Sequence, residues 1–306
     1  MKELLDSFLA RTQEEKLHVL YAQIRQKGET VANWSRFSVL TRLESFSTSK
    51  SFTAVGVGIA IDEGLLTLDE KVADSFPEYT YDVSNLFALG ITVEDMLKMS
   101  SGLSDPLFFR DSPLRATVRD WGRYFYEVGD FVKKPGETFL YCNFNTYMLG
   151  RLIEKKTGQN LHEYLRFRLF EPLRIGNPDW NICPYGHTIA ANGMEINVDE
   201  MGRFCEMMLN KGVFEGKRIV SEEFVQKATS PLIKSDKSIP LENAGFLDYG
   251  YQFWADPARD CFHLWGIFGQ YAVVLPEKNT IVVILSLEEN DDAVGRRVWE
   301  DIITQI

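Results

Sequence analysis

Strand-like segments near both ends of the chain, with helix-like segments between them, limit the folds that this sequence can adopt. Residues 18–35, "HVLYAQIRQKGETVANWS", contain two runs of strand-forming residues around a Lys27-Gly28-Glu29 turn, which is typical of a β-hairpin. Helical spacing follows in the segments 47–63, 120–128, 141–157, 160–170 and 198–210. Strand-like runs return at 249–256, 261–266, 268–276 and 279–286, and an amphipathic helix closes the chain at 291–306.

This order predicts an α+β fold. The N- and C-terminal segments would share one antiparallel sheet covered by the terminal helices, with an all-helical lobe inserted between them. We expect the lobe with the sheet to comprise residues 1–78 and 186–306, and the helical lobe to comprise residues 79–185. An active site is expected between the two lobes.

Size and charge favour a protein that acts on a small molecule. With 306 residues, 45% of them hydrophobic, the chain can bury a sizeable core. Its net charge of -11 argues against nucleic acid or an anionic membrane as partner, because either would need a basic face. Residues 1–17 alternate charges with Leu and Phe and lack the uninterrupted apolar run of a signal peptide, so we expect a surface helix and a cytoplasmic protein.

The cysteines and histidines show neither a C-x-x-C pair nor metal-ligand spacing, so we expect free thiols, no metal and no cofactor. Asp256, Asp260 and His263 are close in sequence, but their spacing fits a turn between strands better than a metal site. The cysteines of the chain are Cys142, Cys183, Cys205 and Cys261, and its histidines are His18, His162, His187 and His263.

Ser47 and Lys50 stand three residues apart, just before the uncharged segment 54–61. In a helix this spacing places both on one face. A lysine that is partly removed from water has a lowered pKa and can act as a base, so the S-x-x-K pattern is typical of an activated serine nucleophile. Taken alone the pattern is weak, since a serine that caps a helix and a lysine that extends to solvent would look the same.

Longer blocks of the sequence resemble the serine β-lactamase-like family, which groups class C β-lactamases, D-alanyl-D-alanine peptidases, related esterases and 6-aminohexanoate-dimer hydrolases. The resemblance covers nearly the whole chain and implies a β-lactamase/transpeptidase-like fold. The blocks that carry it are "FSTSKSFTAVGVGIAIDEGLLTLDEKV", "VEDMLKMSSGL", "KPGETFLYCNFNTYMLGRLIEKKTGQNLHEYL", "FEPLRI", "MGRFCEMMLNKGVFEGKRIVSEEFV", "YGYQFW" and "GIFGQYAVVLPEKNTIVVILS".

The resemblance assigns roles to individual residues. Ser47 would be the nucleophile and Lys50 its base. The family's Y-x-N element corresponds to "YCN", so Tyr141 would be the second acid/base and Asn143 would orient Lys50 or the substrate. Cys142, between them, has no histidine in any recognised pattern nearby and is interpreted as a packing residue.

The family's third element, a strand with K-T-G or H-T-G, departs from its usual form here. A literal Lys156-Thr157-Gly158 closes the helix after Tyr141, so we interpret Gly158 as a helix C-cap. The counterpart is "HLWGIFGQ", in which Leu264 stands at the position of the cation. His263 would point to the opposite face of a regular strand, as a satisfied surface or core histidine.

In that element Gly266 would let the backbone approach a ligand closely. The N–H groups of Ile267 and Ser47 would then form the oxyanion hole.

The sequence therefore predicts a serine hydrolase that cleaves an ester or a small amide through an acyl-enzyme. A β-lactamase or D-alanyl-D-alanine peptidase is the alternative, and a non-catalytic binding module of the same fold is a second one. Leu264 cannot hold a substrate carboxylate as the family's cation does. If the protein hydrolyses β-lactams, then His263, Arg110 or Arg115 has to supply the missing charge. The substrate and the oligomeric state cannot be read from the sequence.

Overall fold

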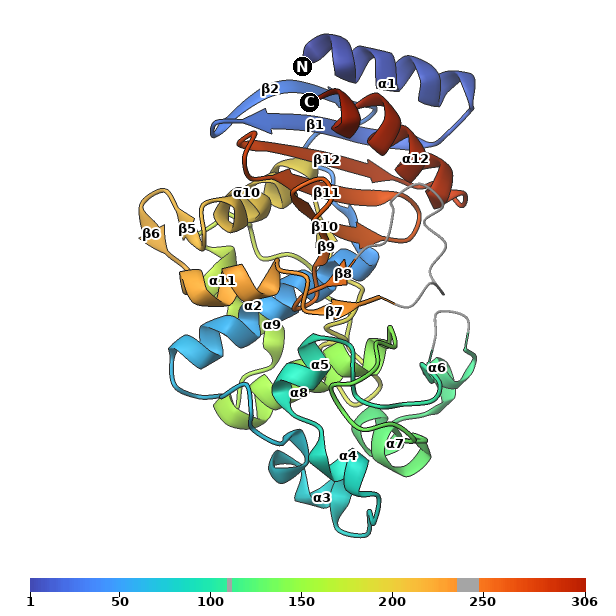
Figure 1. The fold of residues 1–306 in the computed structure, drawn as a ribbon, viewed down its shortest axis with the longest axis vertical. Helices are drawn as coiled ribbons and strands as arrows, with labels where there is room; N and C mark the ends of the chain where they lie inside the picture. Colours follow the sequence, from blue (N-terminus) through green and yellow to red (C-terminus); the bar gives the residue numbers. More distant parts are fainter. Residues whose placement is uncertain (109–111, 236–247) are drawn as a thin grey trace.

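The computed structural model describes residues 1–108, 112–235 and 248–306, and within these residues an eight-stranded antiparallel sheet forms one end of the molecule (Figure 1). The strand order is β2-β1-β12-β11-β10-β9-β8-β7, so the first hairpin is joined to the end of the chain. The strands are β1 (Val19–Gln26), β2 (Glu29–Ser35), β7 (Ile233–Lys234), β8 (Asp248–Tyr249), β9 (Trp254–Asp256), β10 (Cys261–Gly266), β11 (Gln270–Leu275) and β12 (Thr280–Ser286). The predicted shared sheet is therefore confirmed.

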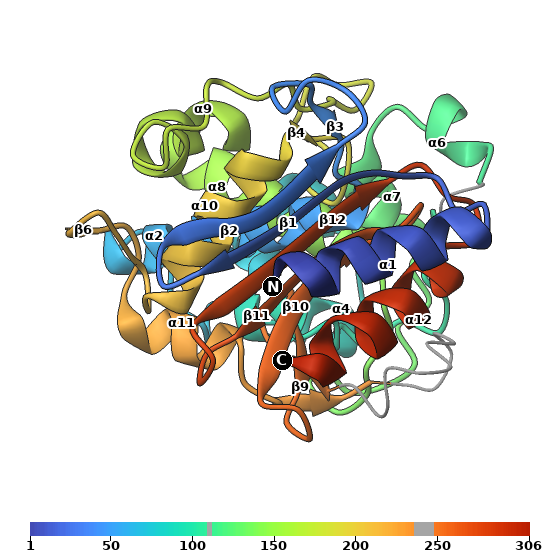
Figure 2. The same cartoon turned by 90° about the horizontal axis from the view of Figure 1, so that it is seen from above.

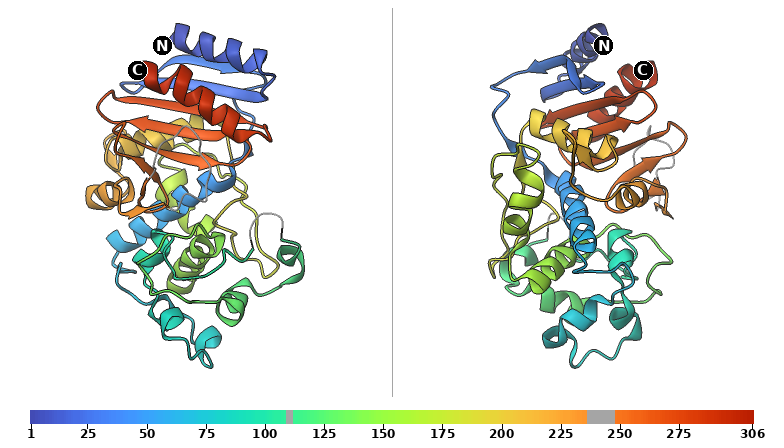
Figure 3. Two further views of the ribbon diagram at one scale, coloured as in Figure 1. Left: turned by 45° about the vertical axis from the view of Figure 1, so that its right-hand side comes forward. Right: turned by 90° about the vertical axis from the view of Figure 1, so that its left-hand side faces the viewer.

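Both faces of the sheet are covered by helices. Every residue of β11 and β12 is buried, as expected for strands packed on two sides. Helices α1 (Lys2–Glu14) and α12 (Asp291–Asp301) lie side by side across one face, and α10 (Val198–Leu209) packs on the other (Figures 2 and 3). The two terminal helices therefore meet over the strands that join the chain's two ends.

The other helices lie below the sheet in Figure 1. Central among them is α2, whose residues 49–60 are all buried and which packs against α8 and α9. These helices are α2 (Ser49–Asp62), α3 (Pro77–Thr80), α4 (Leu86–Gly90), α5 (Val93–Leu97), α6 (Leu114–Thr117), α7 (Trp121–Val128), α8 (Asn143–Thr157), α9 (Leu161–Leu165) and α11 (Glu222–Ala228).

Short elements complete the described structure. They are the 3-10 helices η1 (Phe46–Thr48), η2 (Val72–Ser75) and η4 (Ile303–Gln305), the π-helix η3 (Arg166–Phe170), and the two-stranded pairs β3 (Leu43–Glu44) with β4 (Glu195–Ile196) and β5 (Val213–Phe214) with β6 (Lys217–Arg218). Gly158 ends α8 in the left-handed conformation at φ 71°, which confirms it as a C-cap. The lobe boundaries at residues 78 and 185 stay a prediction.

Two predicted elements are divided in the structure. The segment 160–170 forms α9 followed by the π-helix η3, and the segment 249–256 is interrupted by a turn before β9. Gln252 explains that turn, because its φ is +61° and its buried side chain bonds outside the sheet. The amide donates to the carbonyls of Met96 and Leu97 and accepts from Thr146 Oγ1 at 2.6 Å. Among the residues described, no helix has the length and apolarity needed to cross a membrane.

Candidate active site

Ser47 lies on a tight turn that leads into α2. It belongs to η1 and not to the α-helix itself, so the predicted helix start at residue 47 is two residues early. Phe46, directly before it, has a φ of +48°, a conformation that side chains other than glycine rarely adopt. The turn is held by the Ser45 N–H, which donates to the Met194 carbonyl at 2.8 Å, and by the Phe46 ring, which lies 4.9 Å from that of Phe268.

Lys50 is buried next to Ser47. The lysine is only 1% exposed, in the first turn of α2. Its Nζ lies 3.0 Å from Ser47 Oγ and donates to the Ala191 carbonyl at 2.8 Å. The structure thus brings the predicted nucleophile and its predicted base into direct contact.

The surroundings of Lys50 suit it to act as a base. Burial lowers the pKa of Lys50 to about 7, because the charged form loses its hydration. Nearby Cys142 acts against this shift, and the positive charge of Arg115 adds to it. A substantial fraction of Lys50 is therefore neutral near pH 7 and able to accept a proton.

Tyr141 lies next to both Lys50 and Ser47. The Lys50 Nζ is 4.9 Å from the centre of the Tyr141 ring, which stacks on Trp254 at 5.9 Å and contacts Tyr249 edge-on. Burial raises the pKa of Tyr141 above its usual range, and its contact with Ser47 opposes that shift in part. The phenol thus stays protonated at neutral pH, where it can donate a proton.

At Gly266, the last residue of β10, the backbone comes close to the predicted nucleophile Ser47. A Cβ atom at this position would lie 2.7 Å from the Ser45 carbonyl oxygen and 3.2 Å from the Ser47 nitrogen, so only glycine fits without a shift of the backbone. Ile267 follows directly in the turn. The oxyanion hole formed by the N–H groups of Ile267 and Ser47 stays a prediction that this close approach supports.

Leu264 and His263 occupy opposite faces of β10. Leu264 is 1% exposed and packs in the core on the α2 side of the sheet, whereas the His263 ring lies 5.5 Å from that of Trp299 in α12. His263 is buried as expected, but the expectation that it is satisfied is wrong. Both ring nitrogens lack a hydrogen-bond partner within the described residues. Burial, with the nearby Arg259 charge, lowers the pKa of His263 to about 3, so it cannot replace the missing cation.

Asn143 begins α8 and lines a small pocket together with Ala191 and Arg115. Arg110 lies outside the described residues. Sequence reasoning missed Ala191, whose carbonyl holds Lys50, because a backbone acceptor leaves no sequence signal. It also missed Trp254, which could have been found from the family-like block "YGYQFW".

Cys142 is buried, and its Sγ lies 3.2 Å from the Pro106 carbonyl. Burial raises the pKa of the Cys142 thiol to about 11, so this cysteine is protonated and a poor nucleophile.

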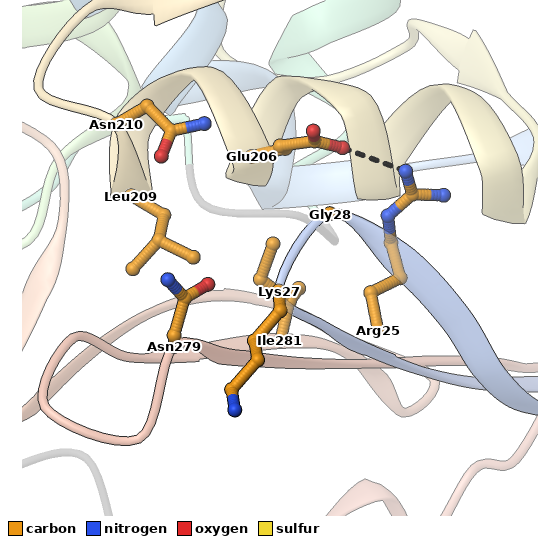
Figure 4. Close-up of a pocket in the computed structure, with 8 residues that line it drawn as sticks. All are labelled: Arg25, Lys27, Gly28, Glu206, Leu209, Asn210, Asn279 and Ile281. Carbon is orange, nitrogen blue, oxygen red and sulfur yellow. Dashed lines mark hydrogen bonds and ion pairs between the residues drawn. The ribbon is translucent and has the colours of Figure 1, made fainter.

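A second hollow lies between the C-terminal end of α10 and the turns of the neighbouring strands (Figure 4). Arg25 Nη2 forms an ion pair with Glu206 Oε2 at 2.6 Å along its wall. Its lining residues are Arg25, Lys27, Gly28, Glu206, Leu209, Asn210, Asn279 and Ile281. None of them is a serine, cysteine or tyrosine, so the lining has no counterpart to the predicted nucleophile Ser47 or to Tyr141.

The model of the Beta-lactamase family matches residues 5–303. Protein flp of Staphylococcus aureus (strain NCTC 8325 / PS 47) is 27% identical over 160 residues, which cover 52% of this chain and 32% of flp. Penicillin-binding protein 4 of Amycolatopsis lactamdurans is 24% identical, with 77% of this chain and 66% of that protein covered. The chain therefore spans about a third of flp and two thirds of the second relative.

Similarity extends to a further relative and to solved structures. The 6-aminohexanoate-dimer hydrolase of Paenarthrobacter ureafaciens is 25% identical, over 84% of this chain and 68% of its own. A penicillin-binding protein homologue from Caulobacter crescentus superposes with a TM-score of 0.76 at 18% identity, covering 99% of this chain and 96% of the other. The octameric homologue from Pyrococcus abyssi gives 0.76 at 22% identity, covering 97% and 76%. At such identities the structural matches establish the fold.

Proposed function

The chain belongs to the β-lactamase family, and we propose that it is a serine hydrolase that cleaves a small ester or amide through an acyl-enzyme. One observation carries the proposal. The buried Lys50, with a pKa of about 7, has its Nζ 3.0 Å from the Ser47 hydroxyl oxygen. A nucleophile and a base within hydrogen-bond reach are the signature of covalent catalysis.

In the acylation step, neutral Lys50 accepts the proton of the Ser47 hydroxyl while Oγ forms a bond to the substrate carbonyl carbon. The electron pair of the carbonyl moves to its oxygen, which accepts hydrogen bonds from the N–H groups of Ser47 and Ile267. When the bond to the leaving group breaks, Tyr141 donates its proton to the departing oxygen or nitrogen and regains one from Lys50.

Deacylation reverses these transfers with water as the nucleophile. Water forms a bond to the acyl carbon while its proton passes by way of Tyr141 to neutral Lys50. The bond to Ser47 Oγ then breaks, Oγ regains a proton from Lys50, and the acid leaves. In this scheme Asn143 orients the substrate or Lys50 through its amide, and no cofactor takes part.

The third element favours substrates without a carboxylate beside β10. In the family a lysine or histidine there helps to hold that group, whereas this chain has the buried Leu264. A β-lactam would lose a charge-assisted hydrogen bond, which is roughly twice as strong as a neutral one. We therefore favour ester or amide hydrolysis over β-lactam or peptide hydrolysis. The cytoplasmic location stays a prediction.

A labelling experiment tests the proposal. A fluorophosphonate probe should modify Ser47 and no other serine, as determined by mass spectrometry of the labelled peptide. The matched control is Ser49→Ala, since Ser49 lies at the same helix start but bonds to Ser45 Oγ at 3.0 Å. Ser47→Ala should lose both the label and the hydrolysis of 4-nitrophenyl esters, whereas Ser49→Ala should keep both. Absence of label on Ser47 in the folded wild type would refute the hydrolase.

A further inference from the structure

A small pocket lies beside the nucleophile on the side of the helices. Asn143 at the start of α8 lines it, as does Ala191, whose carbonyl accepts a hydrogen bond from Lys50. Asn192 and Arg115 also line it, and the exposed surface of the pocket is almost entirely apolar. The apolar lining residues are Phe108, Trp121, Phe144, Tyr147 and Ile189. Any group in this pocket is therefore next to the residues that hold Lys50.

Arg115 is the permanent cation of this pocket. It projects from α6 with its guanidinium carbon 5.8 Å from the centre of the Trp121 ring, and its Nη2 donates to Asn192 Oδ1 at 3.3 Å. Burial lowers its pKa, which shows that part of the hydration of the guanidinium has been lost. An arginine in this condition gains more from an anionic ligand than one in open water.

No carboxylate of the described residues neutralises Arg115 at ion-pair distance. The carboxylate whose charge it experiences is Glu44, three residues before Ser47. Burial raises the pKa of Glu44, although a backbone hydrogen bond at Gly193 and the charge of Arg115 both act to lower it. The guanidinium therefore has unused hydrogen-bonding capacity near the site, since it carries five N–H donors.

The position of the pocket selects the acyl half of the substrate. The leaving group has to reach the Tyr141 hydroxyl, and Tyr141 packs against Trp254 and Tyr249 and does not line this pocket. The acyl group is the part that remains to face Arg115. The positive charge of Arg115 also acts on Lys50, because it helps to lower the pKa of that lysine.

We propose that Arg115 and Asn192 bind a carboxylate at the far end of the acyl group, so that the preferred substrates are monoesters or monoamides of short dicarboxylic acids. This inference rests on the proposed acyl-enzyme function and adds the substrate class. It is compatible with Leu264, because the anion is bound on the helical side of the cleft and not beside β10. Arg115 acts here as a specificity-determining residue.

The test compares two matched substrates, the 4-nitrophenyl monoester of glutaric acid and that of glutaramic acid, in which an amide replaces the free carboxylate. Wild type should prefer the acid in kcat/KM by roughly 10- to 100-fold, the range for a hydrogen bond to a charged group. In Arg115→Gln this ratio should collapse towards one, mainly through KM of the acid. The control Arg119→Gln, whose guanidinium packs over the Tyr185 ring instead, should keep the wild-type ratio.

The ratio separates recognition from a general electrostatic role. If Arg115 served only to lower the pKa of Lys50, Arg115→Gln would slow both esters equally, move the acidic limb of both pH profiles upward and leave the ratio unchanged. That result would overturn the inference, as would a wild-type ratio near one. If neither ester is cleaved and Ser47 takes no label, the proposed function itself fails. If both esters are cleaved at equal rates, the proposed substrate class is wrong, but the proposed hydrolase function still holds.

Discussion

At the scale of single residues, the charge state of Lys50 determines when the site can work. In the proposed mechanism the neutral amine is the reactive form, so we expect activity above the pKa of about 7 and its loss as the pH falls through that value. We expect kcat/KM for a neutral ester to fall about tenfold per pH unit on the acidic side. A pH–rate profile measures this, and a rate that stays level down to pH 5 would contradict it.

Lys50→Arg tests the same point by substitution. A guanidinium keeps its proton at every accessible pH, so this variant should lose activity although it retains the positive charge. Lys134→Arg is the matched control, because the Lys134 side chain is 70% exposed and lies outside the site. Activity in Lys50→Arg above a tenth of the wild-type rate would exclude Lys50 as the base.

Lys50 and Tyr141 should behave as one unit in mutagenesis. In the proposed mechanism the two exchange protons in each half-reaction, so removing either should stop the same sequence of transfers. Lys50→Ala and Tyr141→Phe should each lower kcat by orders of magnitude, and the double variant should be little worse than either one. A double-mutant cycle in which the two losses multiply would show that the residues act independently.

At the scale of elements, the β10–β11 turn has to approach η1. In Gly266→Ala the new Cβ would meet the Ser45 carbonyl at 2.7 Å, and the turn would have to move away from Ser47. We expect kcat/KM to fall roughly 100-fold or more, the cost of losing an oxyanion donor. The control is Gly90→Ala, since a Cβ there meets nothing within 4 Å. Wild-type kinetics in Gly266→Ala would show that the turn takes no part in catalysis.

The elements also show what the sequence could predict. Periodicity located the hairpin, α8, α10 and the last strands, because each has one buried stripe or two buried faces. It missed the turn at Gln252, whose conformation depends on buried contacts with α5 and α8 that are remote in sequence. The nucleophile, base and tyrosine were predicted from family blocks, but Arg115 could be weighed only as one alternative, because its proximity to Lys50 depends on the folded chain.

At the scale of the whole molecule, the buried His263 links stability to acidity. Its folded pKa of about 3 is below the ordinary value of 6.5, so the unfolded chain binds the proton more tightly. Stability is therefore complete above about pH 6.5 and is lost as the pH falls towards 3. The loss is about 1.4 kcal/mol per pH unit at most. Arg259 adds to this effect, because its charge also disfavours the imidazolium.

His263→Leu should remove this dependence. It also removes two buried nitrogens that lack partners within the described residues. Urea unfolding at pH 7 and pH 5 measures the free energy of unfolding of both proteins. The value for the variant minus the value for wild type should be about 2 kcal/mol larger at pH 5 than at pH 7. If the difference in unfolding free energy is the same at both pH values, protonation of His263 does not cause the loss of stability in acid.

The pairing of β1 with β12 has a consequence for the order of synthesis. A ribosome releases residues 19–26 long before residues 280–286, so the first hairpin cannot pair with β12 until residues 280–286 have been made. The termini lie close together in Figure 1, so a circular permutant that joins residue 306 to residue 1 and opens at the exposed Gly216 turn would make this pairing local. We expect it to refold faster in stopped-flow measurements, because fewer residues separate the paired strands. Unchanged refolding kinetics would mean that β1 pairs with β12 after the slowest step of folding. Ser47 and Lys50 would then come together independently of that pairing.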